Sequence, residues 1–352
     1  MFEIFMNDTI DYPKVCICIP AYNAEATIGE TLNSLVSQTY KNINIYVIDN
    51  NSRDKTVEVV EKFVKKYEII KLFKYDKTVP ADENFDRCIT QADGDYTCIF
   101  HSDDVYLPNI IEKEIEFFTA HSDVGAVFTY ANVINENGEK ISEILPNKKL
   151  TEKTIYNFKE LFPLFLKYNN CFVTPSAMVK TEVYKNEIIK HKRQENFGDA
   201  FDVDVWLRIL SKNNVGFIYE KLMNYRLSIY STSFRKLLLY KNTVADGMFN
   251  VLEYTIQERG AIDLLNSTDY INLKNRNMLG KVFKAYVSGD YNYAKKLIKT
   301  INTSDNTNVL KFIKFVFEIM VLIPLPLLLR KILVYAKYRR ILKGQFLKMN
   351  LS

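Results

Sequence analysis

The chain has 352 residues, of which 47% are hydrophobic and 25% are charged, and its formal net charge is +5. These proportions exclude wholesale disorder, and the length suggests about two structural units. The five cysteines show no Cys-x-x-Cys spacing and only three histidines are present, so a disulfide framework and a zinc site are both disfavoured. An odd number of cysteines within apolar runs favours a reducing, cytoplasmic compartment.

Short apolar runs alternate with amphipathic segments over the first hundred residues. The run at residues 14–20 ends at a proline and is typical of a strand buried on both faces. Strands and helices of this length in alternation predict a parallel sheet with helices on both faces. The expected strands are residues 14–20, 42–49, 69–76 and 95–100, and the expected helices are residues 24–38, 54–67 and 81–92.

The next part of the chain is less regular. A helix is expected from Pro108 to about Ala120, then a strand over residues 124–134 and a returning strand over residues 140–145 after a polar turn. Residues 155–240 mix helices with short strands such as residues 215–220. Residues 240–300 have a helical pattern with few breakers.

Polar side chains follow three of the expected strands, at residues 20–23, 49–52 and 101–104. In open α/β sheets the ligand binds beyond the carboxyl ends of the strands. Asp103 and Asp104 are adjacent carboxylates with no basic neighbour, and taken alone they fit a solvated helix cap as well as a site. Three polar strand ends at one edge of the sheet favour a site.

Four segments of residues 14–235 resemble the family 2 glycosyltransferases, which are inverting enzymes that use nucleotide sugars. The resemblance implies the GT-A fold, with a Rossmann-like, mostly parallel sheet, helices on both faces and a helical C-terminal extension. It also implies a role in the assembly of bacterial polysaccharides or glycans. The segments are residues 15–56, 84–108, 201–210 and 218–233.

The resemblance implies a set of donor-binding residues. Tyr22 would stack on the nucleotide base, although a half-buried core aromatic is the alternative. Asp49 would accept a hydrogen bond from the imide N–H of the base, and Arg226 would approach the diphosphate from a mobile loop. Glu25 matches a polar position of the family but also fits a first-turn acid of its helix. The expected nucleotide-sugar-binding residues are Pro20, Ala21, Tyr22, Glu25, Asp49, Asn51, Asn84, Asp103, Asp104 and Arg226.

Asp103 and Asp104 occupy the Asp-x-Asp region of the family, which implies that they bind Mg²⁺ or Mn²⁺ together with the sugar diphosphate. Asp103 is the expected direct ligand. His101 replaces the first acid of the motif, so His101, Asp104 or a water molecule remains open as the next ligand.

The family's general base is an Asp that precedes an acidic-apolar-Trp run. Asp202 takes this position, with Phe201 in place of the usual preceding acid. Asp199 is the alternative base, and any of the nearby acids, Asp204 included, also fits a helix cap.

The last 42 residues, 311–352, carry nine Lys and Arg residues and one acid, Glu318. Their apolar run is about 11 residues long and contains Pro324 and Pro326, which makes it too short to span a membrane. We expect this segment to lie on the cytosolic membrane face, with a helical hairpin packed on the body as the alternative. The expected units are therefore a catalytic domain over residues 1–235, a helical extension over 236–310 and a membrane-associating tail over 311–352.

The expected activity is transfer of a hexosyl or N-acetylhexosaminyl group from a UDP- or dTDP-sugar to a glycan acceptor, lipid-linked in the favoured case. A nucleotidyltransferase is the first alternative, but its glycine-rich basic loop is missing after the first strand. A non-catalytic sugar-binding module is the second, and the presence of Asp49, Asp103 and Asp202 argues against it. No nucleic-acid partner is expected, because no basic face is predicted on the body of the protein.

Overall fold

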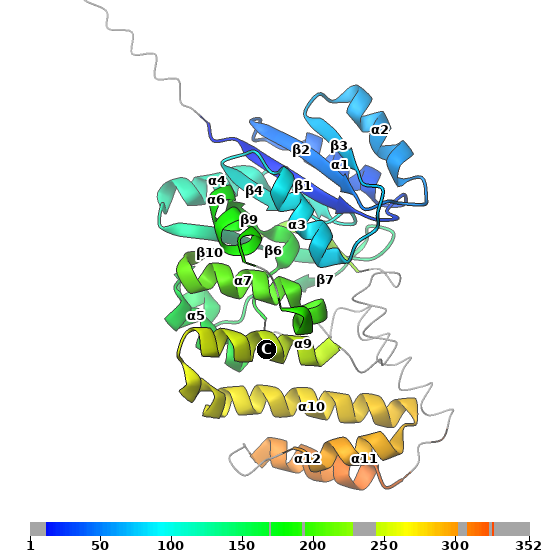
Figure 1. The fold of residues 1–352 in the computed structure, drawn as a ribbon, viewed down its shortest axis with the longest axis vertical. Helices are drawn as coiled ribbons and strands as arrows, with labels where there is room; N and C mark the ends of the chain where they lie inside the picture. Colours follow the sequence, from blue (N-terminus) through cyan, green and yellow to red (C-terminus); the bar gives the residue numbers. More distant parts are fainter. Residues whose placement is uncertain are drawn as a thin grey trace, which may run out of the picture.

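The computed structural model describes residues 12–168, 170–191, 194–227, 244–301, 308–323 and 326. Figure 1 shows a sheet in the upper part of the molecule and a stack of helices below it. The sheet has ten strands. The expected α/β sheet with a helical C-terminal region is therefore confirmed.

The first half of the sheet is parallel, as the alternation of strands and helices predicts. It consists of β1 (Val15–Ala21), β2 (Ile43–Asp49), β3 (Ile70–Lys74) and β4 (Tyr96–Ile99). The helices between them are α1 (Ile28–Val36), α2 (Thr56–Lys66) and α3 (Ala81–Gln91). β1 is buried at six of its seven positions, which explains its unbroken apolar sequence.

The second half of the sheet is mixed. Its strands are β5 (Val105–Tyr106), β6 (Val124–Ile134), β7 (Lys140–Ile144), β8 (Ile155–Tyr156), β9 (Met178–Lys180) and β10 (Asn214–Arg226). β9 is antiparallel to both β4 and β6, and β10 is parallel to β6 but antiparallel to β5 and β8. The order is β3-β2-β1-β4-β9-β6-β10-β5, with β7 on β6 and β8 on β10.

β10 is longer than the strand expected at residues 215–220. Register shifts within its pairing with β6 allow it to continue through 13 residues to Arg226. The strand therefore carries its last residue to the carboxyl edge of the sheet, beside the polar ends of β1 and β4.

Helices and single turns accompany the second half of the sheet. The longer ones are α4 (Ile110–Ala120), α5 (Phe158–Tyr168) and α7 (Phe201–Lys212), and α6 (Thr181–Tyr184) is one turn long. Three 3₁₀ turns, η1 (Leu150–Glu152), η2 (Thr174–Ser176) and η4 (Glu195–Ala200), and a π-helical turn, η3 (Lys185–Ile189), lie between them.

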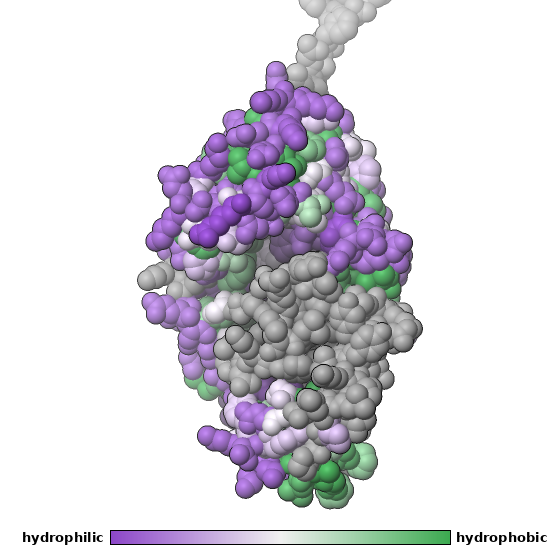
Figure 2. All heavy atoms as spheres, turned by 90° about the vertical axis from the view of Figure 1, so that its right-hand side faces the viewer, coloured by the Kyte–Doolittle hydropathy of each residue, from purple (hydrophilic) through white to green (hydrophobic). Residues whose placement is uncertain are grey.

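The C-terminal part is helical, as expected, and forms the lower layers of Figure 1. It contains α9 (Val244–Glu258), the 3₁₀ turn η5 (Ile262–Asn266), α10 (Thr268–Ser288), α11 (Tyr291–Lys299) and α12 (Asn308–Met320). Ser267 caps the start of α10, and Gly289, with φ of +90°, ends it in the left-handed conformation that suits glycine. Figure 2 shows apolar residues gathered at the lower end of the molecule, where α12 lies.

The hydrophobic core is divided into two clusters. The main cluster runs from β1 through the sheet to Leu273, in the first half of α10, and the second joins residues from Leu279 to Val321. The packing thus changes between residues 273 and 279, whereas the three-part division at residues 235 and 310 stays a prediction. Within the described part of the chain, no helix has the length and apolar character needed to cross a bilayer.

Candidate functional site

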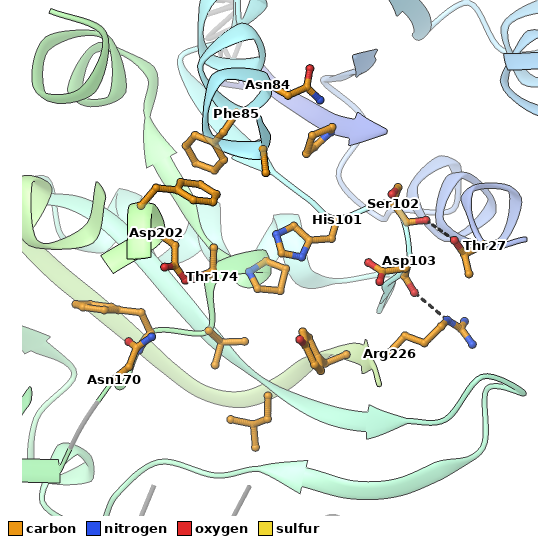
Figure 3. Close-up of a pocket in the computed structure, with 18 of the residues that line it drawn as sticks. Thr27, Asn84, Phe85, His101, Ser102, Asp103, Asn170, Thr174, Asp202 and Arg226 are labelled. Atoms are coloured by element: carbon orange, nitrogen blue, oxygen red, sulfur yellow. Dashed lines mark hydrogen bonds between the residues drawn. The ribbon is translucent and has the colours of Figure 1, made fainter. Parts of the chain in front are cut away.

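A cavity of about 1080 Å³ opens at the carboxyl edge of the sheet. Figure 3 shows side chains entering it from the acidic loop after β4, from α3, from the start of α7 and from the end of β10. These segments are far apart in the sequence, and the sheet brings their ends together. Of the residues expected in the site, the cavity is lined by Pro20, Ala21, Tyr22, Asn84, Asp103, Asp202 and Arg226.

The loop after β1 forms one wall of the cavity. The Tyr22 side chain is 48% exposed, so it is not a core aromatic and its ring is accessible from the cavity. Asn84, one turn into α3, is buried, and its side-chain N–H donates to the Ile48 carbonyl at 3.4 Å. Asn84 is therefore not a solvated position on the surface of its helix.

Asp49 lies behind this wall, at the end of β2. It is 3% exposed, and its Oδ2 accepts the Ser52 N–H at 3.1 Å. Among the described residues, no group donates to its buried Oδ1. A buried carboxylate oxygen without a donor is costly. Asp49 is not among the residues that line the cavity, so its contact with a nucleotide base stays a prediction. The next residue, Asn50, lines the cavity.

Glu25 and Asn51 are not among the residues that line the cavity. The Glu25 carboxylate accepts the Lys55 N–H at 2.8 Å, at the start of α2 rather than within its own helix. Asn51 has φ of +62°, and its side chain donates to the Asp76 carbonyl at 3.1 Å. Both side chains hold the loops around the cavity, and their contact with a nucleotide stays a prediction.

The acidic loop presents three groups that could hold a metal ion: ligand atoms of His101, Asp103 and Asp104 all lie within 4.8 Å of one another. His101 and Asp103 line the cavity, whereas Asp104 is completely buried and does not. Asp104 Oδ1 accepts the backbone N–H of Arg226 at 2.8 Å, and its Oδ2 lies 3.8 Å from His101 Nδ1. Burial raises the pKa of Asp104 well above its usual range.

This donor set fits a divalent cation that prefers oxygen ligands. Two adjacent carboxylates share one loop, and Asp104 Oδ2 is a buried oxygen that accepts no hydrogen bond from the described residues. Asp103 is the carboxylate that faces the cavity. Asp103 as the direct ligand stays a prediction, whereas Asp104 fixes the end of β10 through the backbone N–H of Arg226.

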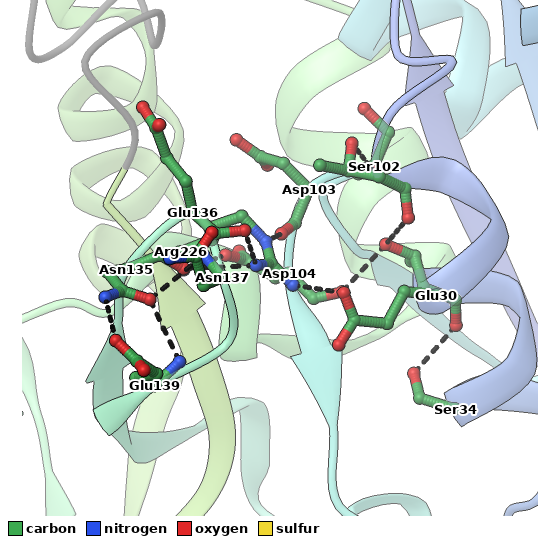
Figure 4. Close-up of polar contacts among 12 residues, drawn as sticks. Glu30, Ser34, Ser102, Asp103, Asp104, Asn135, Glu136, Asn137, Glu139 and Arg226 are labelled. Atoms are coloured by element: carbon green, nitrogen blue, oxygen red, sulfur yellow. Dashed lines mark hydrogen bonds and ion pairs between the residues drawn. The ribbon is translucent and has the colours of Figure 1, made fainter.

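Arg226 holds the acidic loop in place, as Figure 4 shows. Its side chain is only 3% exposed, and its Nε–H donates to the Asp103 carbonyl at 2.8 Å. One terminal nitrogen donates to the carbonyls of Asn135 and Glu136, both at 3.1 Å, and the other contacts the Glu30 carboxylate at 2.5 Å. Arg226 lines the cavity, but its guanidinium group is bound to other protein groups through these four contacts. Arg226 is the last residue of β10, whereas a position in a mobile loop was expected for it. Residues 228–243, which follow this strand, lie outside the described residues.

Asp202 lies in the first turn of α7, on the opposite side of His101 from Asp103 (Figure 3). Its Oδ2 accepts the Thr174 hydroxyl at 3.2 Å, and its Oδ1 accepts the Val203 N–H at 2.8 Å. The surrounding protein removes water from the carboxylate, and this desolvation raises the pKa of Asp202. A raised pKa suits a group that must take up a proton.

The other candidates for the base are placed differently. Asp204 is buried and forms an ion pair with Arg208 at 2.8 Å on the far side of the helix turn, so it has a structural partner. The side chain of Asp199 lies outside the described residues. Trp206 is 1% exposed, and its Nε1–H donates to the Thr174 hydroxyl at 3.0 Å. Trp206 therefore supports the neighbour of Asp202 and does not itself line the cavity.

The sequence did not reveal Thr174 or the apolar wall beyond Asp202. Thr174 belongs to the single turn η2, which has no periodic pattern from which a role could be inferred. The wall contains aromatic and aliphatic side chains from several short elements. Its members include Tyr130, Leu150, Leu164, Tyr168 and Phe172.

Comparison with known proteins relates this chain to glycosyltransferases. Residues 16–186 match the family model described as "Glycosyl transferase family 2". An uncharacterized glycosyltransferase of Methanocaldococcus jannaschii is 29% identical over 225 residues, covering 63% of this chain and 73% of the relative. An uncharacterized glycosyltransferase of Rickettsia typhi is 27% identical over 219 residues, covering 61% of this chain and 64% of the relative.

Among solved structures, that of S. aureus TarS 1–349 in complex with UDP-GlcNAc is similar to this chain with a TM-score of 0.55. The match has 16% sequence identity and covers 93% of this chain and 92% of the other, so it shows a shared fold. Residues 16–186 are therefore similar to glycosyltransferase family 2.

Proposed function

We propose that this protein is an inverting glycosyltransferase that moves a sugar from a UDP- or dTDP-sugar to a hydroxyl group of a glycan acceptor. The observation that carries the proposal is the position of Asp103 and Asp202 on either side of His101 in one cavity. Direct displacement with inversion needs a base on the face of the sugar opposite the leaving diphosphate. Two separated carboxylates in one cavity supply these two positions.

Asp202 is the proposed general base. Its carboxylate takes the proton of the acceptor hydroxyl while that oxygen bonds to the anomeric carbon of the donor. The bond between the anomeric carbon and the diphosphate oxygen breaks at the same time, and its electron pair leaves with the nucleoside diphosphate. Thr174 donates to Asp202 Oδ2 at 3.2 Å and fixes the carboxylate in this direction. Mg²⁺ or Mn²⁺ bound by Asp103 would neutralise charge on the diphosphate.

The donor preference rests on Asp49. Its free Oδ1 is an acceptor, and the imide N–H of uracil or thymine is a matching donor. TarS, which shares the fold, has been crystallised with UDP-GlcNAc, and this supports a uridine nucleotide. The proposed transferred group is a hexosyl or N-acetylhexosaminyl group, and the proposed acceptor is lipid-linked. The enzyme would act in cell-surface polysaccharide assembly, at the cytoplasmic side of the membrane.

A donor screen tests the function. Purified protein is incubated with UDP- and dTDP-sugars, with Mn²⁺, Mg²⁺ or EDTA, and release of nucleoside diphosphate is measured. We expect release with one class of donor, loss of release in EDTA and recovery with excess metal. NMR of the product would show an anomeric configuration opposite to that of the donor. Full activity in EDTA contradicts the metal assignment, and formation of a nucleotide sugar from a sugar phosphate would indicate a nucleotidyltransferase.

Replacing Asp49 with Ala is expected to weaken UDP binding about 10- to 100-fold, because a charge-assisted hydrogen bond contributes about 1.5–3 kcal/mol. Isothermal titration calorimetry measures the affinity. UDP methylated at N3 of the base cannot donate this bond, so the wild-type protein should bind it as weakly as the variant binds UDP. Glu61→Ala is the control, since its carboxylate contacts Lys74 Nζ at 3.2 Å and does not line the cavity. Equal affinity of wild-type protein for both nucleotides would show that Asp49 only shapes its turn.

A further inference from the structure

Large apolar side chains are exposed together on one face of α12 and on the turn that follows it. Phe312 is 66% exposed, Phe315 57% and Ile319 46%, and Leu322 and Ile323 are 67% and 61% exposed. Ten large hydrophobic side chains are exposed in the described part of the chain, and these five fall within twelve residues of each other. We call these five residues the α12 face, and Figure 2 shows an apolar group at the end of the molecule where α12 lies.

The opposite side of α12 is packed, so the α12 face has a fixed direction. Ile313, Phe317 and Met320 pack against the second core cluster, which consists mainly of residues of α10 and α11 and includes Val321, directly after α12. Lys314 Nζ donates to the Ile301 carbonyl at 2.7 Å and anchors the helix to the end of α11. The α12 face therefore points away from the body of the protein, and its exposure is not the result of an unpacked helix.

Charge indicates what could cover this face. Residues 327–352 lie outside the described residues, and they contain seven Lys and Arg residues and no Asp or Glu. A second copy of the chain on the α12 face would bring two such segments close together, and they would repel each other. Folding the segment back on α12 would offer it one carboxylate on that helix, Glu318, which already faces Lys314 at 3.7 Å. An anionic lipid surface offers acyl chains to the apolar side chains and negatively charged headgroups to the Lys and Arg residues.

We propose that the α12 face docks on an anionic lipid bilayer, with its apolar side chains among the acyl chains. This inference rests on the membrane association in the proposed function and makes it specific to five residues. It also sets the orientation of the enzyme. Figure 1 shows α7, α9, α10 and α12 as successive layers, with α12 at the far end from the sheet.

The helices α9 and α10 lie between α7 and α12, so they separate the cavity from the lipid. Packed helices lie about 8–10 Å apart, so three steps separate Asp202 from the bilayer surface by roughly 25–30 Å. A lipid-linked acceptor has to cover this distance before its hydroxyl reaches the base. The acceptor class that fits is a glycan of several sugar units, which the enzyme extends, rather than a lipid that carries one sugar.

Docking is tested with full-length protein and vesicles of phosphatidylglycerol and phosphatidylcholine in equal amounts. We expect hydrogen exchange of the amides in residues 308–323 to slow when vesicles are added. The triple variant Phe312→Ser, Phe315→Ser, Ile319→Ser should bind the vesicles at least tenfold more weakly than the wild type. Ile262→Ser is the matched control, because Ile262 is 59% exposed on η5, outside the α12 face, and this variant should bind normally.

Several results would overturn the proposal. Vesicle binding without slower exchange in residues 308–323 would mean that another surface docks. A wild-type dimer that dissociates in the triple variant, measured by light scattering, would mean that a second copy covers the face. Nucleoside diphosphate release from the donor should be unchanged in the triple variant, so a failure of docking and a failure of the glycosyltransferase activity give different results.

The single Trp206 reports the orientation. It lies on α7, beside the cavity wall, so lipids brominated on their acyl chains should leave its fluorescence unchanged. In a Phe315→Trp variant the added indole should be quenched by the same lipids. Quenching of Trp206 in the wild-type protein would mean that the catalytic domain itself lies on the bilayer, and the proposed separation would be wrong.

Discussion

Replacing Asp202 with Asn is expected to lower kcat about 10²–10⁴-fold while donor affinity changes little, because a general base acts on the acceptor proton in the transition state. Asn keeps the shape of the side chain and can still accept from Thr174, but it cannot take up a proton. Steady-state kinetics with the donor found in the screen measure kcat, and calorimetry with UDP measures donor-site affinity.

The matched control is Asp204→Asn, in the same turn of α7. Asp204 forms a buried ion pair with Arg208, so its loss should lower stability by an amount on the order of 3 kcal/mol. The rate of the folded enzyme should stay close to that of the wild type. If Asp202→Asn keeps the wild-type kcat and Asp199→Asn does not, the base is Asp199.

The pH profile gives an independent readout of the same residue. Only the ionised form of Asp202 can accept a proton, and burial raises its pKa. The rate should therefore fall as the pH is lowered through this raised pKa, at a higher pH than an exposed carboxyl would give. In Asp202→Asn the residual rate should not show this decrease at low pH.

The first half of the fold could be predicted because its strands and helices have local patterns. β1 and β2 are almost completely buried, so β1 is an apolar run and β2 is interrupted only by Asn44 before its terminal Asp49. α1 and α2 each place buried residues at helical spacing. Their alternation leaves a parallel arrangement as the simplest topology. No long-range information is needed for any of these steps.

The second half could not be predicted to the same extent, because its strands depend on partners that are distant in the sequence. β5 and β8 have two residues each and β9 has three, which is too short for a period-two pattern. β9 exists as a strand because it fits between β4 and β6. The extent of β10 depends on irregular pairing with β6, and its local sequence does not indicate this.

The candidate site shows the same division. Asp49 and Asp103 stand at the ends of apolar strands, and the sequence around Asp202 resembles a known motif. These three residues could therefore be proposed as site residues from the sequence alone. The contact of Thr174 with Asp202 spans 28 positions and that of Arg226 with Glu30 spans 196. Such contacts depend on the topology and have no local sequence signal. The sequence therefore suggested that Arg226 contacts the diphosphate, but it did not predict the hydrogen bonds of Arg226 to the acidic loop.

Replacing Arg226 with Lys is expected to loosen the acidic loop and to lower kcat/KM by about 10²-fold or more. The planar guanidinium reaches four acceptors at once, whereas an ammonium group has three donors at one point and cannot match this geometry. Backbone carbonyls left without donors in a buried site also cost stability, on the order of 2–3 kcal/mol. Because Asp103 is the proposed metal ligand, we expect weaker Mn²⁺ binding, measured by electron paramagnetic resonance with saturating UDP.

Hydrogen exchange of the ligand-free protein separates this role from direct contact with the diphosphate. If Arg226 positions the loop, amides of residues 101–105 should exchange faster in Arg226→Lys before any ligand is added. Glu30→Gln is the control: Glu30 is 54% exposed, and this change leaves the three carbonyl contacts of Arg226 in place, so loop exchange and kcat/KM should change less than about threefold. Unchanged exchange in Arg226→Lys, together with weaker UDP binding, would show that Arg226 acts on the nucleotide itself. In that case its present contacts with Asp103 and Glu30 would have to be exchanged for contacts with the diphosphate when the donor binds.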